Sequence, residues 1–322
     1  MTRGPRPAPL WQCAGARWDR HELALVWRHP AQGERLSPLT PDRPLSFTTG
    51  PRRDCVGVRR GARHTPCPAG AEVTASAVSA QCPDCARLDR SYSVAADTRT
   101  DDPRPYDVYL AWFGPDLVKV GITAAEREGA RLLEQAALSY CLLGRGPLMA
   151  ARRAEAVLGA ALGVPDRFPY AAKRTAREAP PPPERRAADL AALHQRARGL
   201  GGLPESLALA PFEPVHHDVA FHLDRVRPEP GLIRLVPETT VAGRIDAVAG
   251  PDLHLTGTDG RALLLDTRQL AGWPLAPAAA DARGGAGAGG GGPGGAVLSA
   301  AAVLSAHSLA QPSHPGRTRP DS

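Results

Sequence analysis

The chain has 322 residues and a formal net charge of +6, with 43% hydrophobic and 5% aromatic residues. This length allows about two domains, and the lack of any run of about 18 apolar residues excludes a membrane-spanning helix. Arginine supplies all but two of the 39 basic residues, as in proteins from GC-rich genomes, so the positive charge permits nucleic-acid binding without demonstrating it. Because the first residues lack the apolar stretch of a secretory signal, we expect a cytoplasmic protein whose cysteines stay reduced.

In chain order, the sequence predicts five parts. They are a β-rich segment at 1–52, a four-cysteine zinc region at 53–92, an α/β core with a trailing helix at 105–200, a small β domain at 213–275 and a tail at 276–322. The tail is rich in Gly, Ala and Pro and cannot bury enough apolar surface to offset its ordering entropy, so we predict that it is disordered. Apolar and polar residues alternate in 213–275, as in a sheet or small barrel. The sequence leaves open whether these strands pair with the N-terminal ones.

Four of the six cysteines follow the pattern Cys55-x11-Cys67-x14-Cys82-x2-Cys85. Zinc prefers four soft ligands in a tetrahedron, and a Cys-x2-Cys turn presents two thiolates to one ion. The two single cysteines make the pattern looser, and Cys13 or His64 is an alternative for one ligand. A redox Cys-x2-Cys pair normally opens a helix, whereas this pair precedes a polar stretch. We therefore predict a structural zinc ion with all four coordination positions filled by Cys55, Cys67, Cys82 and Cys85.

The best-patterned stretch is 105–164, which predicts the order β-β-α-β-α. A strand at 107–113, a turn at 114–116 and a return strand at 117–122 form a hairpin. A helix at 124–137 follows Thr123 as N-cap, and a third strand at 138–143 ends at Gly144. Pro147 opens a second helix, which runs to Leu162 and is closed by Gly163. A further polar helix is predicted at 183–198, and Cys141 is predicted to be a buried thiol in the third strand.

Glu155 interrupts the apolar face of the second helix. Leu148, Ala151, Leu158 and Leu162 share one face at the helical period, and Glu155 falls within it. A carboxylate that faces a core without a partner costs several kcal/mol, so it is paired, binds a metal or lines a cleft. The alternative is that this face is only half-buried and that Glu155 pairs with Arg152 or Arg131.

Several short motifs together resemble a known superfamily. The segment Val108-Tyr109-Leu110 is followed by Lys119-Val-Gly-Ile-Thr123, then by an arginine on the first helix and a glutamate on the second. This order is similar to the GIY-YIG nucleases, in the variant with Lys-Val-Gly-Ile as the second motif. The wider chain, from about 11 to 275, has Pro-Cys-Pro and Gln-Cys-x2-Cys ahead of this core and is similar to an uncharacterised bacterial family of unknown function. The fold class that follows is α+β, with a GIY-YIG-like core, a zinc-binding loop region and a small β domain.

The resemblance implies magnesium-dependent hydrolysis of a phosphodiester. It implies that Tyr109 assists the attacking water, that Arg131 neutralises charge on the phosphate and that Glu155 holds the magnesium ion. Arg127 lies one helical turn before Arg131 and competes for the same role. These residue types suit the reaction, because a positioned water, a cation and a Lewis acid each stabilise the transition state. One carboxylate with waters and phosphate oxygens suits magnesium.

Two further residues are candidate substrate contacts, and two positions depart from the family pattern. Gly121 has no Cβ and would let the hairpin backbone approach a substrate closely. Lys119 replaces the second tyrosine of the family, where it either contacts phosphate or covers the edge of the sheet with its stem. Asp107 stands in place of the first glycine. These departures weaken the case for an intact nuclease.

Three functions are consistent with these observations. The first is a magnesium-dependent nuclease, or a relative acting on a phosphodiester of DNA, RNA or a nucleotide, with structural zinc. The second is a zinc-containing protein that binds nucleic acid without turnover, and the third is a protein-interaction module. The basic pairs Arg52-Arg53 and Arg152-Arg153 favour the first two. Trp112, Phe113 and Tyr140 could stack on bases, although we expect each of them to pack in the core.

Overall fold

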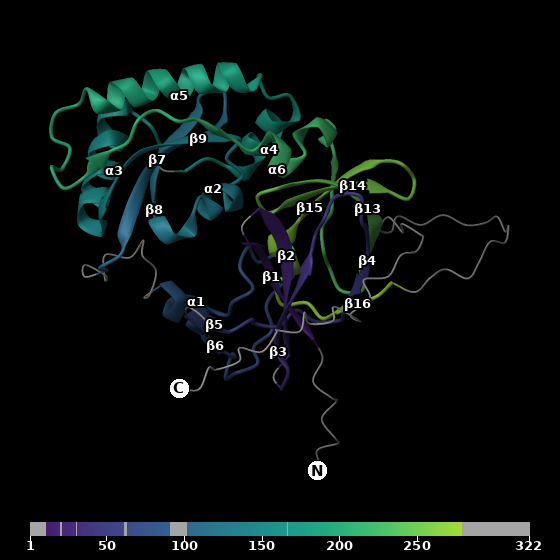
Figure 1. Cartoon of the computed structure of the whole chain (residues 1–322). Helices are drawn as coiled ribbons and strands as arrows, with labels where there is room; N and C mark the ends of the chain where they lie inside the picture. Colours follow the sequence, from purple (N-terminus) through teal and green to yellow (C-terminus); the bar gives the residue numbers. More distant parts are fainter. Residues whose placement is uncertain are drawn as a thin grey trace, which may run out of the picture.

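The structure is a computed structural model that describes residues 11–19, 21–29, 31–60, 63–90, 102–165 and 167–278. These residues form six α-helices and several β-sheets, so the predicted mixed α+β class is confirmed. In Figure 1 the α/β core, coloured blue-green to teal, lies above the purple strands and the short blue elements of the cysteine region. The predicted tail at 276–322 falls almost wholly outside the described residues.

The core is built on a five-stranded antiparallel sheet with β7 between β8 and β9. Its strands are β7 (Pro105–Gly114), β8 (Leu117–Ala124), β9 (Ser139–Pro147), β10 (Ala208–Leu209) and β11 (Val215–His216). The predicted hairpin is therefore present as β7 and β8, and its turn is completed by Asp116 with a φ of 59°. The third strand, β9, runs beyond the predicted end at Gly144. A Cβ at Gly144 would lie 2.7 Å from the carbonyl oxygen of Ala208, so this glycine allows β10 to pair closely and does not end the strand.

Helices cover both faces of this sheet. The six helices are α1 (Pro83–Arg90), α2 (Ala130–Glu134), α3 (Leu148–Leu162), α4 (Tyr170–Glu178), α5 (Pro183–Arg198) and α6 (Asp218–Phe221). Successive residues of a strand point to opposite faces. Trp112 points to the face with α5, where its Nε1 donates to Asp189 at 3.2 Å. Phe113 points to the other face, where α4 places the ammonium of Lys173 3.7 Å from the centre of its ring. Helix α3 packs beside α5 and also contacts β8, the last strand of the sheet.

The predicted single helix at 124–137 is wrong. The chain instead forms a short 3-10 turn, η1 (Ala125–Arg127), and then the brief helix α2. Glu128 and Gly129 between them have φ values of 43° and 82°, in the left-handed region that ends helices. The second helix is as predicted, because α3 begins after Pro147 and Gly163 closes it with a φ of 66°.

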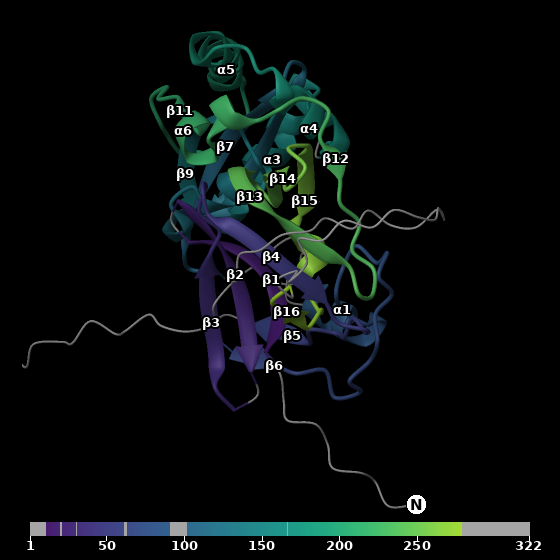
Figure 2. The ribbon, with the colours of Figure 1, turned by 90° about the vertical axis from the view of Figure 1, so that its right-hand side faces the viewer.

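Two further sheets bring together the two ends of the described chain. Strands β1 (Gln12–Asp19), β2 (Glu22–His29) and β3 (Gly33–Pro38) form an antiparallel meander. The second sheet has the order β12-β15-β14-β13-β4-β16 and is visible from the side in Figure 2. Its strands are β4 (Pro44–Thr49), β12 (Gly231–Leu232), β13 (Thr240–Ala249), β14 (Asp252–Gly257), β15 (Ala262–Asp266) and β16 (Leu275–Ala276). Strand β4 comes from the N-terminal segment and pairs with β13 and β16, so the pairing that the sequence left open is present.

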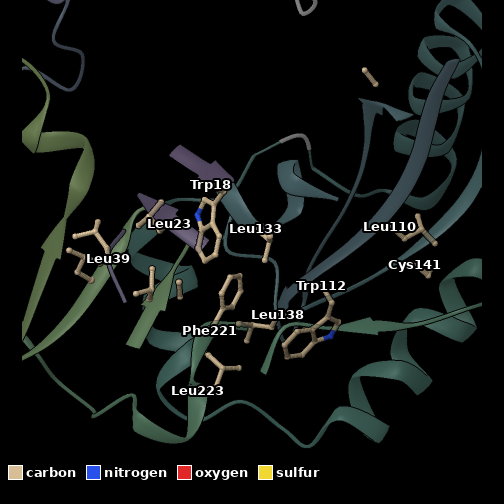
Figure 3. Packing of buried hydrophobic residues seen from close by; sticks show 14 of the residues in the cluster. Trp18, Leu23, Leu39, Leu110, Trp112, Leu133, Leu138, Cys141, Phe221 and Leu223 are labelled. Carbon is tan, nitrogen blue, oxygen red and sulfur yellow. The ribbon is translucent and has the colours of Figure 1, made fainter. Parts of the chain in front are cut away.

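One large apolar cluster joins these sheets to the core. Figure 3 shows Trp18 of β1 near Leu133 and Phe221, with Trp112 and Leu138 further into the α/β core. The ring of Trp18 lies 5.7 Å from that of Phe221, and its Nε1 donates to the carbonyl of Gly250 at 2.9 Å. Buried aromatic side chains stabilise such a junction by roughly 2–3 kcal/mol each. The β-sheets and the core therefore form a continuous packed body.

Candidate functional site

The four predicted ligand cysteines form one cluster. Cys55 follows the short bridge between Asp54 and Glu72, Cys67 follows the hairpin of β5 (Val58–Arg60) and β6 (Arg63–Thr65), and Cys82 and Cys85 flank the start of α1. Their four sulfur atoms lie within 4.8 Å of one another. Zinc–sulfur bonds of about 2.3 Å in a tetrahedron place the sulfurs about 3.8 Å apart. The Sγ atoms of Cys67 and Cys82 are separated by 3.8 Å, so the cluster has the dimensions of a zinc site.

The backbone around the cluster is shaped to hold thiolates. The backbone N–H groups of Cys82 and Gly57 donate to the Sγ of Cys55, at 3.2 and 3.4 Å. Hydrogen bonding from the backbone N–H of Ala71 lowers the pKa of Cys67 to about 7, whereas burial raises the pKa of Cys85. Gly57 has a φ of 72°, and a Cβ there would lie 2.2 Å from the carbonyl oxygen of Thr65, so only glycine fits this turn. Four thiolates with backbone donors are a donor set that suits zinc.

The two alternative ligands lie elsewhere. The Nε2 of His64 is 2.7 Å from the carbonyl oxygen of Val56, to which it is hydrogen-bonded. Cys13 is buried in β1 with its thiol near the carbonyl of Gly15, and belongs to the large apolar cluster. Contrary to the prediction, the pair Cys82-Pro-Asp-Cys85 does open a helix, α1, as a redox pair would. A metal site is nevertheless favoured, because Cys55 and Cys67 bring their sulfur atoms to those of Cys82 and Cys85.

Arg53 ties the cysteine region to the second β-sheet. Its side chain is 1% exposed, and its Nε donates to the carbonyl of Ala271 at 2.9 Å. Its Nη1 donates to the carbonyls of Thr74, Ala75 and Ala77, at 2.8–3.2 Å. The prediction that the Arg52-Arg53 pair favours nucleic-acid binding is therefore wrong for Arg53, whose charge is used inside the protein.

A second cluster surrounds the phenol of Tyr109 on β7. Tyr109 is 1% exposed, and its Oη accepts a hydrogen bond of 3.1 Å from the Nε2 of Gln135. Burial raises the pKa of this phenol, Gln135 and the charge of Arg131 lower it, and the carboxylate of Glu155 raises it. The charges of Arg131 and Glu155 therefore both influence the pKa of the Tyr109 hydroxyl, although α3, which carries Glu155, packs mainly against the opposite face of the sheet.

Gly121 explains how the phenol reaches the edge of the sheet. A Cβ at Gly121 would lie 2.4 Å from the Oη and 2.5 Å from the Cζ of Tyr109. The ring of Tyr109 thus crosses β8 at Gly121, and β8 is the last strand of the sheet, against which α3 packs. The space beside Gly121 is thus filled by Tyr109 of the same hairpin, and the predicted contact of Gly121 with a substrate stays a prediction.

The remaining predicted residues are Lys119, Arg131 and Arg127, and their contacts differ. The Nζ of Lys119 is 6.0 Å from the centre of the Tyr109 ring. Arg131 is about half exposed, with its Nη1 3.5 Å from Glu134, whereas Arg127 makes a closer ion pair of 2.5 Å with the same carboxylate. Arg127 also lines a surface hollow of about 350 Å³ beside Trp18. Of the two candidate arginines, Arg131 is the one whose charge is among the main influences on the pKa of Tyr109.

Two residues near the phenol were not singled out from the sequence for a site. Gln135 ends α2 and holds Tyr109, and Lys173 on α4 donates to the carbonyl of Gln135 at 3.2 Å. Lys173 is 7% exposed, and burial, with the charges of Lys119 and Arg131, lowers its pKa to about 8. The signal that could have found it is composition, because Lys119 and Lys173 are the two lysines of the chain.

Asp107 and the aromatic candidates are engaged inside the protein. Arg145 donates two hydrogen bonds to Asp107, at 2.6 and 3.1 Å. Trp112 and Phe113 are at most 1% exposed and pack in the core, as expected. Cys141 is fully buried, which raises its pKa to about 12 and confirms the prediction of a buried thiol.

Comparisons with known proteins give one match. The model of the family described as "Protein of unknown function (DUF2797)" matches residues 43–275, which include both clusters. No curated protein and no solved structure matches the chain. The comparisons do not show a GIY-YIG core, so that resemblance stays a hypothesis. In the part of the chain that the structure describes, every helix is too short or too polar to cross a bilayer.

Proposed function

We propose a function for this chain, which belongs to the DUF2797 family. In this proposal the α/β core acts on a phosphodiester of nucleic acid, and the four-cysteine cluster is a structural zinc site. The observation that supports the first part is the environment of Tyr109. One phenol is held by Gln135, with the charges of Arg131 and Glu155 acting on it and Lys119 beside its ring. A phenol, cations and one carboxylate around one point suit hydrolysis at phosphorus.

Each of these residues has a role in the proposed reaction. Tyr109 orients the attacking water, and Arg131 and Lys119 stabilise the charge that develops on the phosphate oxygens. Glu155 would hold a magnesium ion, which would stabilise the leaving oxygen as a Lewis acid. The oxygen of the water bonds to phosphorus as the P–O bond to the leaving group breaks. The attacking water releases one proton to solvent, and the leaving oxygen takes one from solvent.

The zinc site has a structural role in this proposal. The cysteine region has a small apolar cluster of its own, made mainly of Val58, Val73 and the cysteines. Such a cluster buries too little surface to fold the segment, and a structural zinc ion contributes folding free energy directly. We propose that this region, 53–92, and the β domain at 213–275 help to hold the nucleic acid beside the core.

The second candidate function is nucleic-acid binding without turnover. This function is favoured by the burial of Tyr109, which is 1% exposed. A phenol that assists an attacking water must be accessible to that water. Asp107, in the place of the family's first glycine, is held by Arg145 in a pair that leaves it no role at a substrate. Lys119, in the place of the second tyrosine, supplies charge for binding but no phenol.

The test uses the full chain, with its zinc, against supercoiled plasmid DNA and end-labelled RNA in magnesium buffer. Glu155→Gln should abolish cleavage, and Glu205→Gln, which removes an exposed acid outside the core, the cysteine region and the β domain, should leave it unchanged. A mobility shift that persists in EDTA and in Glu155→Gln, without cleavage by the wild type, would favour the binding protein. A wild type that neither cleaves nor shifts nucleic acid at low salt would refute both functions.

A further inference from the structure

The two lysines of this chain lie near each other in the fold. Arginine fills 37 of the 39 basic positions, and Lys119 and Lys173 fill the other two. Lys119 is on β8 and Lys173 on α4, yet both side chains lie on the face of the sheet that carries Tyr109 and Phe113. Among the neighbouring charges, that of Lys119 has the largest effect on the pKa of Lys173. A chain that otherwise uses arginine therefore places its two compact ammonium groups on the same face of one sheet.

Lys173 is held in a pocket that fits an ammonium and leaves it donors to spare. Its Nζ lies 3.7 Å from the centre of the Phe113 ring and 5.0 Å from that of Tyr170. Within the described residues it donates one hydrogen bond, to the carbonyl of Gln135, although an ammonium has three donors. Helix α4 also approaches β7 closely, since a Cβ at Gly114 would lie 2.4 Å from the Cβ of Ala176. The flat guanidinium of an arginine is larger than the ammonium and would crowd this space.

The charges that act most strongly on Lys173 are all positive. They belong to Lys119, Arg131, Arg177 and Arg268. Three of them have acidic partners, because Arg177 pairs with Asp252 at 2.6 Å, Arg268 with Asp266 at 2.5 Å and Arg131 with Glu134 at 3.5 Å. Lys119 and Arg131 lie on the side of Tyr109, with the Nζ of Lys119 6.0 Å from the centre of its ring. Like charges gathered around a 93%-buried ammonium cost free energy, and a bound anion would offset that cost.

A purely structural role explains only part of this arrangement. Lys173 does satisfy the last carbonyl of α2, as cations near a helix C-terminus commonly do. That role needs one cation and gives no reason for Lys119 and Arg131 to gather beside it. We propose that Lys119 and Lys173, with Arg131, form a binding site for one phosphate group next to Tyr109. This rests on the proposed function, in that the phosphate belongs to the scissile phosphodiester or to the one beside it.

The scarcity of lysine gives a direct test. Selective labelling with [13C]lysine produces two Cε signals from the folded, zinc-containing chain, which single Lys119→Met and Lys173→Met variants assign. Titration with inorganic phosphate, without magnesium and at constant ionic strength in chloride, should move both signals with one dissociation constant. Lys173→Met should weaken phosphate binding at least tenfold, whereas Arg261→Met, which removes the same charge from an exposed site, should not. Phosphate that moves neither signal, or that of Lys119 alone, overturns the site.

This experiment separates the phosphate site from the proposed reaction. If both lysine signals respond while the wild type cleaves no nucleic acid, the phosphate site stands and the nuclease proposal fails. If the wild type cleaves nucleic acid while neither signal responds, and Lys173→Met leaves KM unchanged, the phosphate site fails and the reaction stands. The wild-type titration needs no variant to fold, so an unstable Lys173→Met protein does not weaken the test.

Discussion

Replacing Gly121 with alanine is the sharpest perturbation that the structure offers at the Tyr109 cluster. The added methyl group would lie 2.4 Å from the Oη and 2.5 Å from the Cζ of Tyr109. Carbon atoms in contact are normally about 3.5–4.0 Å apart, so the ring must retreat by about 1 Å. Tyr109 is 1% exposed and hydrogen-bonded to Gln135, and it therefore has little room to move.

The expected cost follows from these contacts. Overpacking of a filled core costs about 1–3 kcal/mol, and loss of the Gln135 hydrogen bond adds about 1 kcal/mol. We expect Gly121→Ala to lower the free energy of unfolding by about 2–4 kcal/mol. Gly159→Ala is the matched control, because nothing lies within 4 Å of a Cβ at this position in α3. Alanine is favoured over glycine in a helix by about 1 kcal/mol, so this variant should be more stable than the wild type.

Urea unfolding of the three proteins at fixed zinc concentration measures both effects as shifts in the midpoint at a constant slope. Amide hydrogen exchange on β7 and β8 should be faster in Gly121→Ala alone, since the hairpin must open to admit the methyl group. Equal stability of Gly121→Ala and the wild type, with unchanged exchange, would show that the Tyr109 ring does not cross β8 at this position. The account of the phenol at the sheet edge would then be wrong.

Three further predictions concern the metal, a buried amine and a buried guanidinium. Native mass spectrometry should find one zinc ion in the wild type and in Cys141→Ser but none in Cys85→Ser, and zinc retained by Cys85→Ser would contradict the site. Because the pKa of Lys173 is lowered from 10.5 to about 8, the folded chain binds fewer protons than the unfolded chain between these values. The wild type should therefore gain stability relative to Lys173→Met as the pH rises from 8 to 10.5, by up to about 3 kcal/mol in urea titrations, and a pH-independent difference would refute this. Arg53→Leu leaves four carbonyls without their donor and should lower the free energy of unfolding by about 3–5 kcal/mol. Arg52→Leu, at an exposed ion pair, should lower it by less than about 1 kcal/mol. Equal losses of stability on thermal unfolding would disprove the buried contact.

The parts of the fold that the sequence predicted are those set by neighbouring residues. The hairpin of β7 and β8 follows from two runs of β-forming residues around Gly114-Pro115, and α5 begins at Pro183 as the pattern indicated. The prediction of one helix at 124–137 was wrong, because good helix formers lie on both sides of Gly129 and gave no sign of the left-handed turn there. Its charged and apolar residues look helical by propensity, and propensity is easily overridden by the tertiary position of the chain.

The contacts that the sequence did not predict join distant segments. Strand β4 pairs with β13, about two hundred residues further along, and periodicity within either segment cannot choose that partner. In the sequence Arg53 looks like an exposed charge, because its acceptors, the carbonyls of Ala271 and Ala77, lie far from it along the chain. For the candidate site, the motif suggested Tyr109 and Arg131, but Lys173 is brought to them only by the packing of α4.

The same contacts indicate how the proposed zinc site is connected to the rest of the protein. Asp54, next to Cys55, donates its backbone N–H to the carbonyl of Gly272 at 2.9 Å, and Arg53 reaches Ala271. Both acceptors belong to the turn that leads into β16, which pairs with β4 of the second sheet. Loss of a metal from this site should therefore free the cysteine region and this turn first. The Tyr109 cluster should keep its geometry, because Gln135, just after α2, and Lys173 on α4 hold it. The zinc ion is thus expected to govern stability, and the buried phenol with its ammonium groups to govern any chemistry on phosphate.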